Sequence, residues 1–158
     1  MIDLATPSSI GEILAVRELV KEYAASLNVN LCFQDLDAEL ASLPGQYAEP
    51  RGALRVALSN GELAGCCGLR LLDHVDYSNA CEMKRLFVRP RFRGLGIGRR
   101  LAEDILDTAR LAGYACVLLD TLSDMETARA MYQELGFIEI PPYYFNPIPG
   151  SHYLKVDL

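Results

Sequence analysis

One stretch decides the fold of this 158-residue chain, residues 82–100, which read EMKRLFVRPRFRGLGIGRR. A strand-like segment, 80–88, leads to three glycines at alternate positions (Gly94, Gly96 and Gly98), and a helical pattern follows. Glycine lets the main chain turn tightly and approach a ligand, because it carries no Cβ. The helix start adds unpaired N–H donors and the positive end of its dipole. The stretch therefore predicts a strand, loop and helix that bind a phosphate group.

The positive charge of the chain is concentrated in the same place. Residues 84–100 hold seven of the 15 basic side chains and no acidic one, whereas the rest of the chain carries eight basic and 21 acidic side chains. The net charge of −6 thus divides into +7 and −13, with Arg93, Arg99 and Arg100 around the helix start. This distribution favours one anion site and disfavours nucleic acid, since basic and aromatic residues do not alternate over a wider surface.

The glycine loop has three other interpretations. A glycine-rich turn with solvated arginines needs no ligand. A Walker loop needs Lys and then Ser or Thr after its last glycine, and Arg99 and Arg100 stand there. A Rossmann fingerprint needs a third glycine where Arg99 lies, although Asp120 stands near the position of a ribose-binding acid. The polar residues of strand 80–88 and the five residues before the first glycine disfavour it.

Hydrophobic periodicity, turn residues and caps predict one α/β domain over residues 1–158. Ser9 and Glu12 have the spacing of a capping box, and so have Ser123 and Glu126. The expected strands are 2–5, 54–58, 63–71, 80–88, 115–119, 137–140 and 152–158. The expected helices are 9–27, a shorter one ending before Pro44, one ending at Gly113 and one ending at Gly136. Glu82, Lys84 and Arg85 indicate that strand 80–88 borders a cleft or water.

Composition excludes several classes of protein. The five cysteines are odd in number and form no Cys-x-x-Cys pair, so buried thiols are expected rather than disulfides or a metal site. Asp73, His74 and Asp76 cluster in a polar segment, and no metal is assigned to them. No apolar run approaches the roughly 20 residues that span a bilayer, and residues 1–9 do not look like an export signal. We therefore expect a cytoplasmic protein without a membrane partner. The cysteines are Cys32, Cys66, Cys67, Cys81 and Cys116.

Two motifs resemble the GNAT superfamily of acyl-CoA dependent N-acyltransferases. The family's pyrophosphate motif (Arg or Gln, two residues, Gly, one residue, Gly or Ala) is matched by Arg93, Gly96 and Gly98. A later motif is matched by Ala128, Tyr132, Gly136 and Phe137. The likeness covers residues 54–140 well and the N-terminal helices loosely. It departs at position 125, where many members have Asn and this chain has Met125, so one side-chain contact to the cofactor is expected to be lost.

This resemblance implies a single-domain GNAT fold. Its mixed, mostly antiparallel sheet would have helices on both faces and a splay between strands four and five, where the pantetheine of acetyl-CoA lies. The main chain of Leu86, Phe87 and Val88 would pair with the pantetheine amides. The N–H groups from Arg93 or Gly94 through Leu95, Gly96, Ile97 and Gly98 to Arg99 would hold the pyrophosphate, and Ala128 and Tyr132 would complete the cofactor site.

The resemblance also implies acetyl transfer to an amine, with Tyr132 as the group that donates a proton to the sulfur. Tyr132 could instead be a core aromatic on a helix face. Glu82 is the candidate base, directly or through a water, because its strand flanks the cleft; alternatively, it pairs with Lys84 or Arg85.

The acceptor is a small-molecule or protein amine whose identity the sequence does not give. Its candidate walls are the first two helices, around Phe33, and the loop 141–147 with its aromatic residues and prolines, which is otherwise a packed loop or a homodimer contact. An enzyme with acetyl-CoA as cosubstrate is the leading hypothesis. A CoA-binding sensor or interaction module without catalysis is the alternative.

Overall fold

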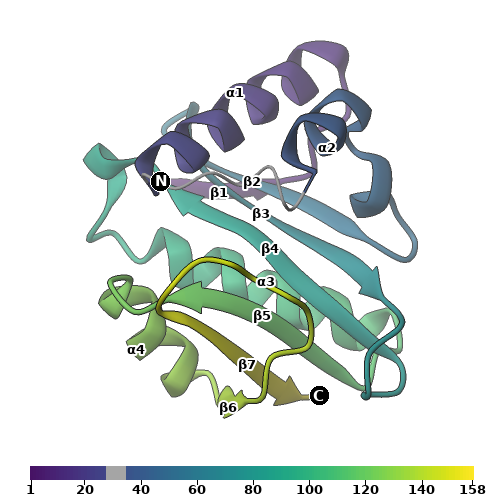
Figure 1. The fold of residues 1–158 in the computed structure, drawn as a ribbon. Helices are drawn as coiled ribbons and strands as arrows, with labels where there is room; N and C mark the ends of the chain where they lie inside the picture. The colour runs from purple at the N-terminus through teal and green to yellow at the C-terminus, as the bar shows by residue number, and fades with distance from the viewer. Residues whose placement is uncertain (28–34) are drawn as a thin grey trace.

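A computed structural model of the chain describes residues 1–27 and 35–158 (Figure 1). Seven strands form one sheet in the order β1-β2-β3-β4-β5-β7-β6. Every neighbouring pair is antiparallel except β4 and β5, which are parallel. The strands are β1 (Ile2–Ala5), β2 (Ala53–Ser59), β3 (Glu62–Leu72), β4 (Ala80–Val88), β5 (Cys116–Leu122), β6 (Ile138–Ile140) and β7 (Ser151–Asp157). The predicted mixed, mostly antiparallel sheet is confirmed.

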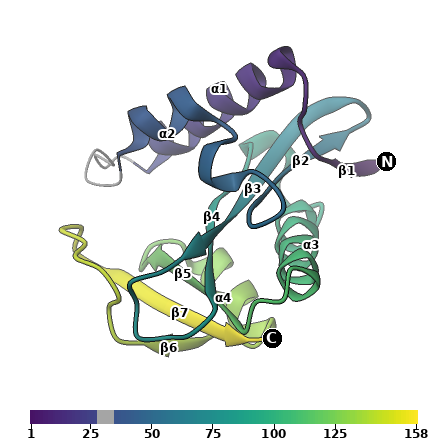
Figure 2. The same cartoon turned by 90° about the vertical axis from the view of Figure 1, so that its right-hand side faces the viewer.

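Helices cover both faces of the sheet, as predicted (Figure 2). On one face lie α1 (Ile10–Ser26), α2 (Leu36–Ser42) and the short η2 (Gly45–Tyr47). They enclose a core that includes Leu19, Leu54 and Phe87. On the other face, η3 (Pro90–Phe92) leads into α3 (Ile97–Leu111), and α4 (Glu126–Glu134) follows β5. The core on this side includes Leu101 and Val117.

Local sequence signals explain where most elements begin and end. Ser9 and Glu12 form the predicted capping box of α1, with both hydrogen bonds at 3.1 Å. Asn60 and Gly61 both have positive φ, at 50° and 85°, as a two-residue hairpin turn requires. The prediction of a second capping box, formed by Ser123 and Glu126, is wrong, because α4 begins after Met125 with no side-chain cap. The Ser123 hydroxyl instead donates to the Gly150 carbonyl at 2.9 Å, toward the loop before β7.

A β-bulge in β4 reverses the faces of the strand. Gly68 pairs with Lys84 and Cys66 with Phe87, so Arg85 and Leu86 share the place opposite one residue of β3, and Arg85 has a φ of 60°. Before the bulge, Met83 faces the α3 core; after it, Phe87 faces the α1 core. The side chains of Lys84 and Arg85 consequently lie next to each other in the wall of one cavity.

The sheet opens between β4 and β5. Their pairing is limited to Ala80 with Cys116, Cys81 with Val117 and Glu82 with Leu118. From Met83 onward the described part of β4 has no β5 partner, and the two strands diverge (Figure 2). The predicted splay between the fourth and fifth strands is therefore present, and the loop before α3 lies at the end of β4 next to this opening.

Candidate functional site

The loop before α3 has the shape of an anion cradle. Gly94 and Gly96 have φ values of 84° and 76°, and a Cβ added at either would meet no atom within 4 Å. Gly96 is the N-cap of α3 and makes no side-chain cap, so no N-cap side chain accepts from the first N–H groups of the helix. The N–H of Arg93 already donates to the Pro90 carbonyl, so the row of available donors begins at Gly94. A phosphate group fits there.

The arginines near this loop make contacts of their own. That Arg93, Arg99 and Arg100 add positive charge around the anion site stays a prediction. Arg99 pairs with Glu103 at 2.8 Å and with Glu134 at 2.7 Å. Arg100 donates to the Ile2 carbonyl at 3.0 Å, and Arg93 donates to the Val88 carbonyl at 3.0 Å. The cradle therefore depends chiefly on main-chain N–H groups and the helix dipole.

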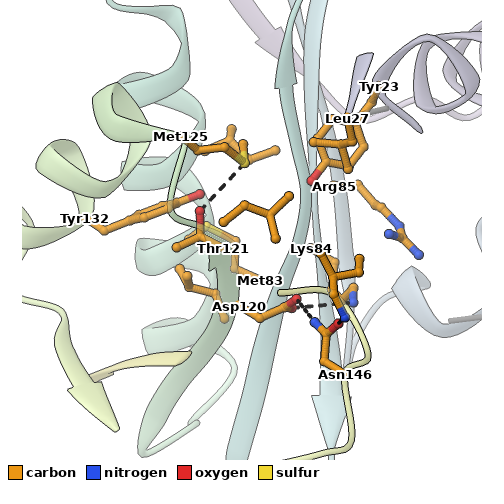
Figure 3. Close-up of a pocket in the computed structure, with 14 residues that line it drawn as sticks. Tyr23, Leu27, Met83, Lys84, Arg85, Asp120, Thr121, Met125, Tyr132 and Asn146 are labelled. Carbon is orange, nitrogen blue, oxygen red and sulfur yellow. Dashed lines mark hydrogen bonds and ion pairs between the residues drawn. The ribbon is translucent and has the colours of Figure 1, made fainter. Parts of the chain in front are cut away.

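A cavity lies in the opening between β4 and β5 (Figure 3). Lys84, Arg85 and Leu86 form its wall on β4. Thr121 and its neighbours on β5 form the other wall. Tyr132 reaches in from α4 on the side opposite Lys84 and Arg85. Of the three polar residues of β4 that the sequence assigned to a cleft, Lys84 and Arg85 line this cavity.

Tyr132 combines both roles that the sequence left open. It is buried, and its ring packs edge-on against Phe137 at 5.5 Å between centroids, so it is part of the core. It also lines the cavity. Burial raises the pKa of Tyr132 well above its ordinary value of 10, so the hydroxyl keeps its proton near neutral pH. A buried, protonated phenol at a cavity wall is chemically able to donate a proton.

The remaining motif residues are placed unequally. Met125, where many family members have Asn, lines the cavity and accepts a 3.8 Å hydrogen bond from Thr121 through its sulfur. Ala128 is half-buried and packs against the α3 core. The side chain of Phe87 packs in the α1 core, with its ring centroid 5.5 Å from that of Tyr23. Its main chain is therefore the part that can face a ligand in the opening. The side chain of Ile97 is buried in the core, which leaves only its N–H for the cradle.

A second cavity, of about 380 Å³, shares the lining residue Lys84 with the first. Glu82 forms part of its floor and is 1% exposed. Its carboxylate accepts hydrogen bonds from Arg70 Nε at 2.8 Å and from the Tyr143 hydroxyl at 2.6 Å. The predicted pairing of Glu82 with Lys84 or Arg85 thus needs correction, since Arg70, opposite Glu82 on β3, is its ion-pair partner.

Two more ion pairs surround the same part of β4. Lys84 Nζ lies 3.8 Å from Asp120 of β5, bridging the opening. Arg85 holds Glu39 of α2 with two hydrogen bonds, at 2.9 and 3.2 Å. Burial lowers the pKa of Lys84. Three cations and three carboxylates therefore stand in pairs along the site.

The loop between β6 and β7 covers the site, crossing β5 toward β4 (Figure 1). The Tyr144 hydroxyl donates to Asp120 at 2.8 Å, and Asn146 Nδ2 lies 3.4 Å from the same oxygen. Loop residues Tyr143, Tyr144 and Asn146 line the two cavities, while Phe145 at the tip is 84% exposed. That the loop forms a wall of the acceptor site stays a prediction. Phe33, the other predicted wall residue, lies outside the described residues.

Sequence reasoning missed Arg70, Asp120 and Tyr143 as parts of this site. Asp120 was considered only as a ribose ligand, and Arg70 was hidden in an apolar strand. An available signal was the register, because Arg70 opposite Glu82 in an antiparallel hairpin predicts a cross-strand pair.

Comparison with known proteins gives the family. The sequence model of the Acetyltransferase (GNAT) family matches residues 15–137. An uncharacterised N-acetyltransferase of Schizosaccharomyces pombe is 37% identical, over 89% of this chain and 85% of that protein. One of Dictyostelium discoideum is 34% identical, over 90% of this chain and 93% of its own. This chain belongs to the GNAT family of acetyltransferases.

More distant relatives add a named product and the fold. The N-acetylaspartate synthetase of Rattus norvegicus is 31% identical over 84% of this chain, which spans 44% of that protein. A GNAT acetyltransferase structure from Staphylococcus aureus superposes with a TM-score of 0.80 at 20% identity, covering 99% of both chains. The PaiA N-acetyltransferase of Thermoplasma acidophilum, solved with coenzyme A, superposes with a TM-score of 0.74 at 13% identity, covering 100% and 99%.

Within 1–27 and 35–158, no group of three or more His, Cys, Asp or Glu side chains is arranged to hold a metal ion. In the same ranges, no helix has the length and apolar character needed to cross a bilayer. The four cysteines described, at 66, 67, 81 and 116, are buried thiols without disulfides, as predicted.

Proposed function

We propose that residues 1–158 form one N-acetyltransferase domain that moves the acetyl group of acetyl-CoA to a primary amine of a small molecule or protein, by direct attack in a ternary complex. The observation that carries this proposal is the opening between β4 and β5. It runs beside the glycine cradle and holds a cavity with a protonated phenol in its wall. Membership of the GNAT family and the coenzyme A complex of a structural neighbour support it.

Acetyl-CoA supplies the acetyl thioester, and this chain holds it by its main chain. The N–H groups from Gly94 to Arg99 receive the pyrophosphate at the start of α3. The edge of β4 over Leu86, Phe87 and Val88, which lacks a β5 partner, pairs with the pantetheine amides. Ala128, which packs against the α3 core, completes the proposed cofactor site.

The transfer requires two proton movements. The amine nitrogen bonds to the thioester carbonyl carbon, the carbon to sulfur bond breaks, and the acetylated amine loses a proton while the leaving thiolate gains one. Tyr132 donates to the sulfur from the first cavity. Glu82, in the second cavity, takes the proton from the amine. Because both of its carboxylate oxygens already accept hydrogen bonds, one from Arg70 and one from Tyr143, the proton reaches Glu82 through a bridging water or hydroxyl.

The proposal is tested by thiol release from acetyl-CoA with purified protein and a panel of amines, amino acids, polyamines and aminoglycosides. Release that depends on one class of acceptor is expected. Tight binding of CoA with no thiol released by any acceptor would instead support the alternative, a binding module without catalysis.

Tyr132→Phe separates catalysis from binding. It removes one oxygen from a ring that stays packed on Phe137, so we expect turnover to fall by about 100-fold or more, because one general acid contributes about 10²- to 10⁴-fold. Affinity for acetyl-CoA should stay within about twofold by calorimetry. Equal turnover in the two proteins would remove Tyr132 from the mechanism.

We also propose that the protein works in the cytoplasm, where thiols stay reduced, which suits its buried cysteines. The chemistry above needs no metal. A homodimer stays a prediction, and sedimentation of the purified protein would test it.

A further inference from the structure

We propose that the Tyr143 hydroxyl carries the proton of the acceptor amine to Glu82, which makes Tyr143 a further catalytic residue of the transfer. This inference rests on the proposed function and deepens it, because it names the group that joins the amine to the base. It starts from the surroundings of the Glu82 carboxylate in the second cavity.

The Glu82 carboxylate is held at both oxygens and is almost closed to solvent. Its Oε1 lies 2.8 Å from Arg70 Nε and 2.7 Å from Arg70 Nη2. Its Oε2 accepts a hydrogen bond from the Tyr143 hydroxyl at 2.6 Å. Because the side chain is only 1% exposed, a water molecule in the cavity finds almost no surface of Glu82 to touch. An amine proton therefore reaches Glu82 through a side chain that already contacts it.

Of the two side chains that the structure places on these oxygens, Tyr143 is the one able to pass a proton. The Arg70 guanidinium stays protonated and has no acceptor lone pair, whereas a phenol hydroxyl both donates and accepts. Burial and the charge of Glu82 raise the pKa of Tyr143 above its ordinary value of 10. The hydroxyl is consequently protonated near neutral pH, with its proton on the hydrogen bond to Glu82 and its oxygen able to accept from an amine.

Tyr143 stands between Glu82 and the space where an acceptor fits. Its side chain is half-buried and lines the cavity of about 380 Å³. Its ring packs against Tyr144 and edge-on against Tyr153, with centroids 5.4 Å apart in both pairs. These contacts lie on the loop that crosses the opening toward β4 (Figure 1). They fix the hydroxyl at the cavity wall, so an amine there meets Tyr143 before Glu82.

The proton transfer balances. As the amine nitrogen bonds to the thioester carbonyl carbon, a proton leaves the nitrogen for the Tyr143 oxygen, and the hydroxyl proton moves to Oε2 of Glu82. Tyr143 thus ends as a neutral hydroxyl and Glu82 as a carboxylic acid, while the sulfur takes its proton from Tyr132 as proposed above. Solvent then takes the proton of Glu82 by the reverse path, and Tyr132 regains one.

The relay requires an amine N–H within hydrogen-bond reach of the Tyr143 oxygen and places no demand on the net charge of the acceptor. Side chains of both signs surround the cavity, so their charge alone does not select one class of amine. The charged and titratable groups that line it are Asp35, Arg70, Asp73, His74, Glu82 and Lys84, together with the two tyrosines of the loop.

Tyr143→Phe tests the relay, because it removes the hydroxyl and keeps the ring on Tyr144 and Tyr153. In the thiol-release assay, with an acceptor that the natural protein uses, we expect kcat to fall by about 100-fold or more, since a positioned acid or base contributes about 10²- to 10⁴-fold. The affinity for acetyl-CoA in calorimetry should be unchanged, because the hydroxyl lies on the acceptor side.

Tyr153→Phe is the matched control. Tyr153 belongs to the same group of packed rings, but its hydroxyl donates to the main-chain carbonyl of Tyr144 at 3.4 Å and not to a carboxylate. Its kcat should equal that of the natural protein. A kcat of Tyr143→Phe as high as that of Tyr153→Phe overturns the inference.

A cycle of variants separates a relay from mere support of the loop. Glu82→Gln should itself lower kcat by about 100-fold or more. Adding Tyr143→Phe to Glu82→Gln should lower kcat by less than about a further twofold, because a relay without its base has no work left. Losses that multiply, or full activity in Glu82→Gln, overturn the inference. If Glu82→Gln does not fold without its ion pair to Arg70, the comparison of Tyr143→Phe with Tyr153→Phe decides.

The two proposals fail in different ways. If the natural protein releases no thiol with any acceptor, the proposed function fails and the relay fails with it. If release depends on an acceptor and Tyr143→Phe keeps the natural kcat, the relay alone is overturned and the acetyltransferase proposal stands.

Discussion

Replacing Glu39 by Gln should destabilise the domain more than any change at an exposed ion pair. Arg85 and Glu39 join β4 to α2, and their side chains are 4% and 11% exposed. Glu39→Gln keeps the shape of the side chain but leaves the Arg85 guanidinium buried without its carboxylate. Breaking a buried pair in this way costs about 3–5 kcal/mol, a large share of a typical domain's 5–15 kcal/mol.

The assay is equilibrium unfolding in urea followed by far-UV circular dichroism. With an m value of about 2 kcal/mol per molar, the midpoint should fall by about 1.5–2.5 M. Glu18→Gln is the matched control, because Glu18 pairs with Lys21 in an exposed i,i+3 pair, and less than about 0.5 kcal/mol is expected there. The double variant Glu39→Gln with Arg85→Gln should recover part of the loss. Equal midpoints for Glu39→Gln and Glu18→Gln would refute the reasoning.

Two further predictions concern the cradle and the core. Gly96→Glu should abolish CoA binding in calorimetry and cost only about 1–2 kcal/mol of folding free energy, because φ is 76° but the added Cβ has space. Asn tolerates this φ, so the control Gly96→Asn should fold and bind CoA better than Gly96→Glu. CoA binding retained by Gly96→Glu would refute the phosphate site. Burial raises the pKa of Cys66 to about 12 from 9.0, so its protonated thiol stabilises the fold fully below pH 9 and this contribution is lost as pH rises from 9 to 12. Cys66→Ala should flatten that part of the pH profile of unfolding, and an unchanged slope would argue against it.

Elements governed by local patterns were predictable from the sequence. The strand 80–88 and the hairpin around Asn60 and Gly61 follow from alternation and turn chemistry, and both are present with nearly the expected bounds. Gly113 and Gly136 end their helices with φ values of 88° and 97°, the left-handed conformation that glycine supplies. The resemblance of Ala128, Tyr132, Gly136 and Phe137 to a GNAT motif predicted Tyr132 for the cofactor site, and Tyr132 lines the first cavity.

Features decided by tertiary contact were not predictable. The spacing of Ser123 and Glu126 fits a cap, but the Ser123 hydroxyl finds Gly150 and His152 across the chain. Arg99 looked like a phosphate ligand, yet Glu103 and Glu134 hold its side chain. The bulge at Arg85 leaves no strong local signal, because Lys84 and Arg85 in succession read equally well as two polar residues of a regular strand.

Only three residue pairs between β4 and β5 join the two parts of this sheet. The first part ends with β4, and the second part holds β5, β7 and β6. Along most of the length of β4 and β5 the two parts are therefore not joined by main-chain hydrogen bonds. A ligand paired with both edges would act as an eighth, removable strand. A ligand that binds only the folded domain would then raise its free energy of unfolding as the concentration of the ligand rises above the dissociation constant, so the stability of the domain would depend on how far the opening is occupied.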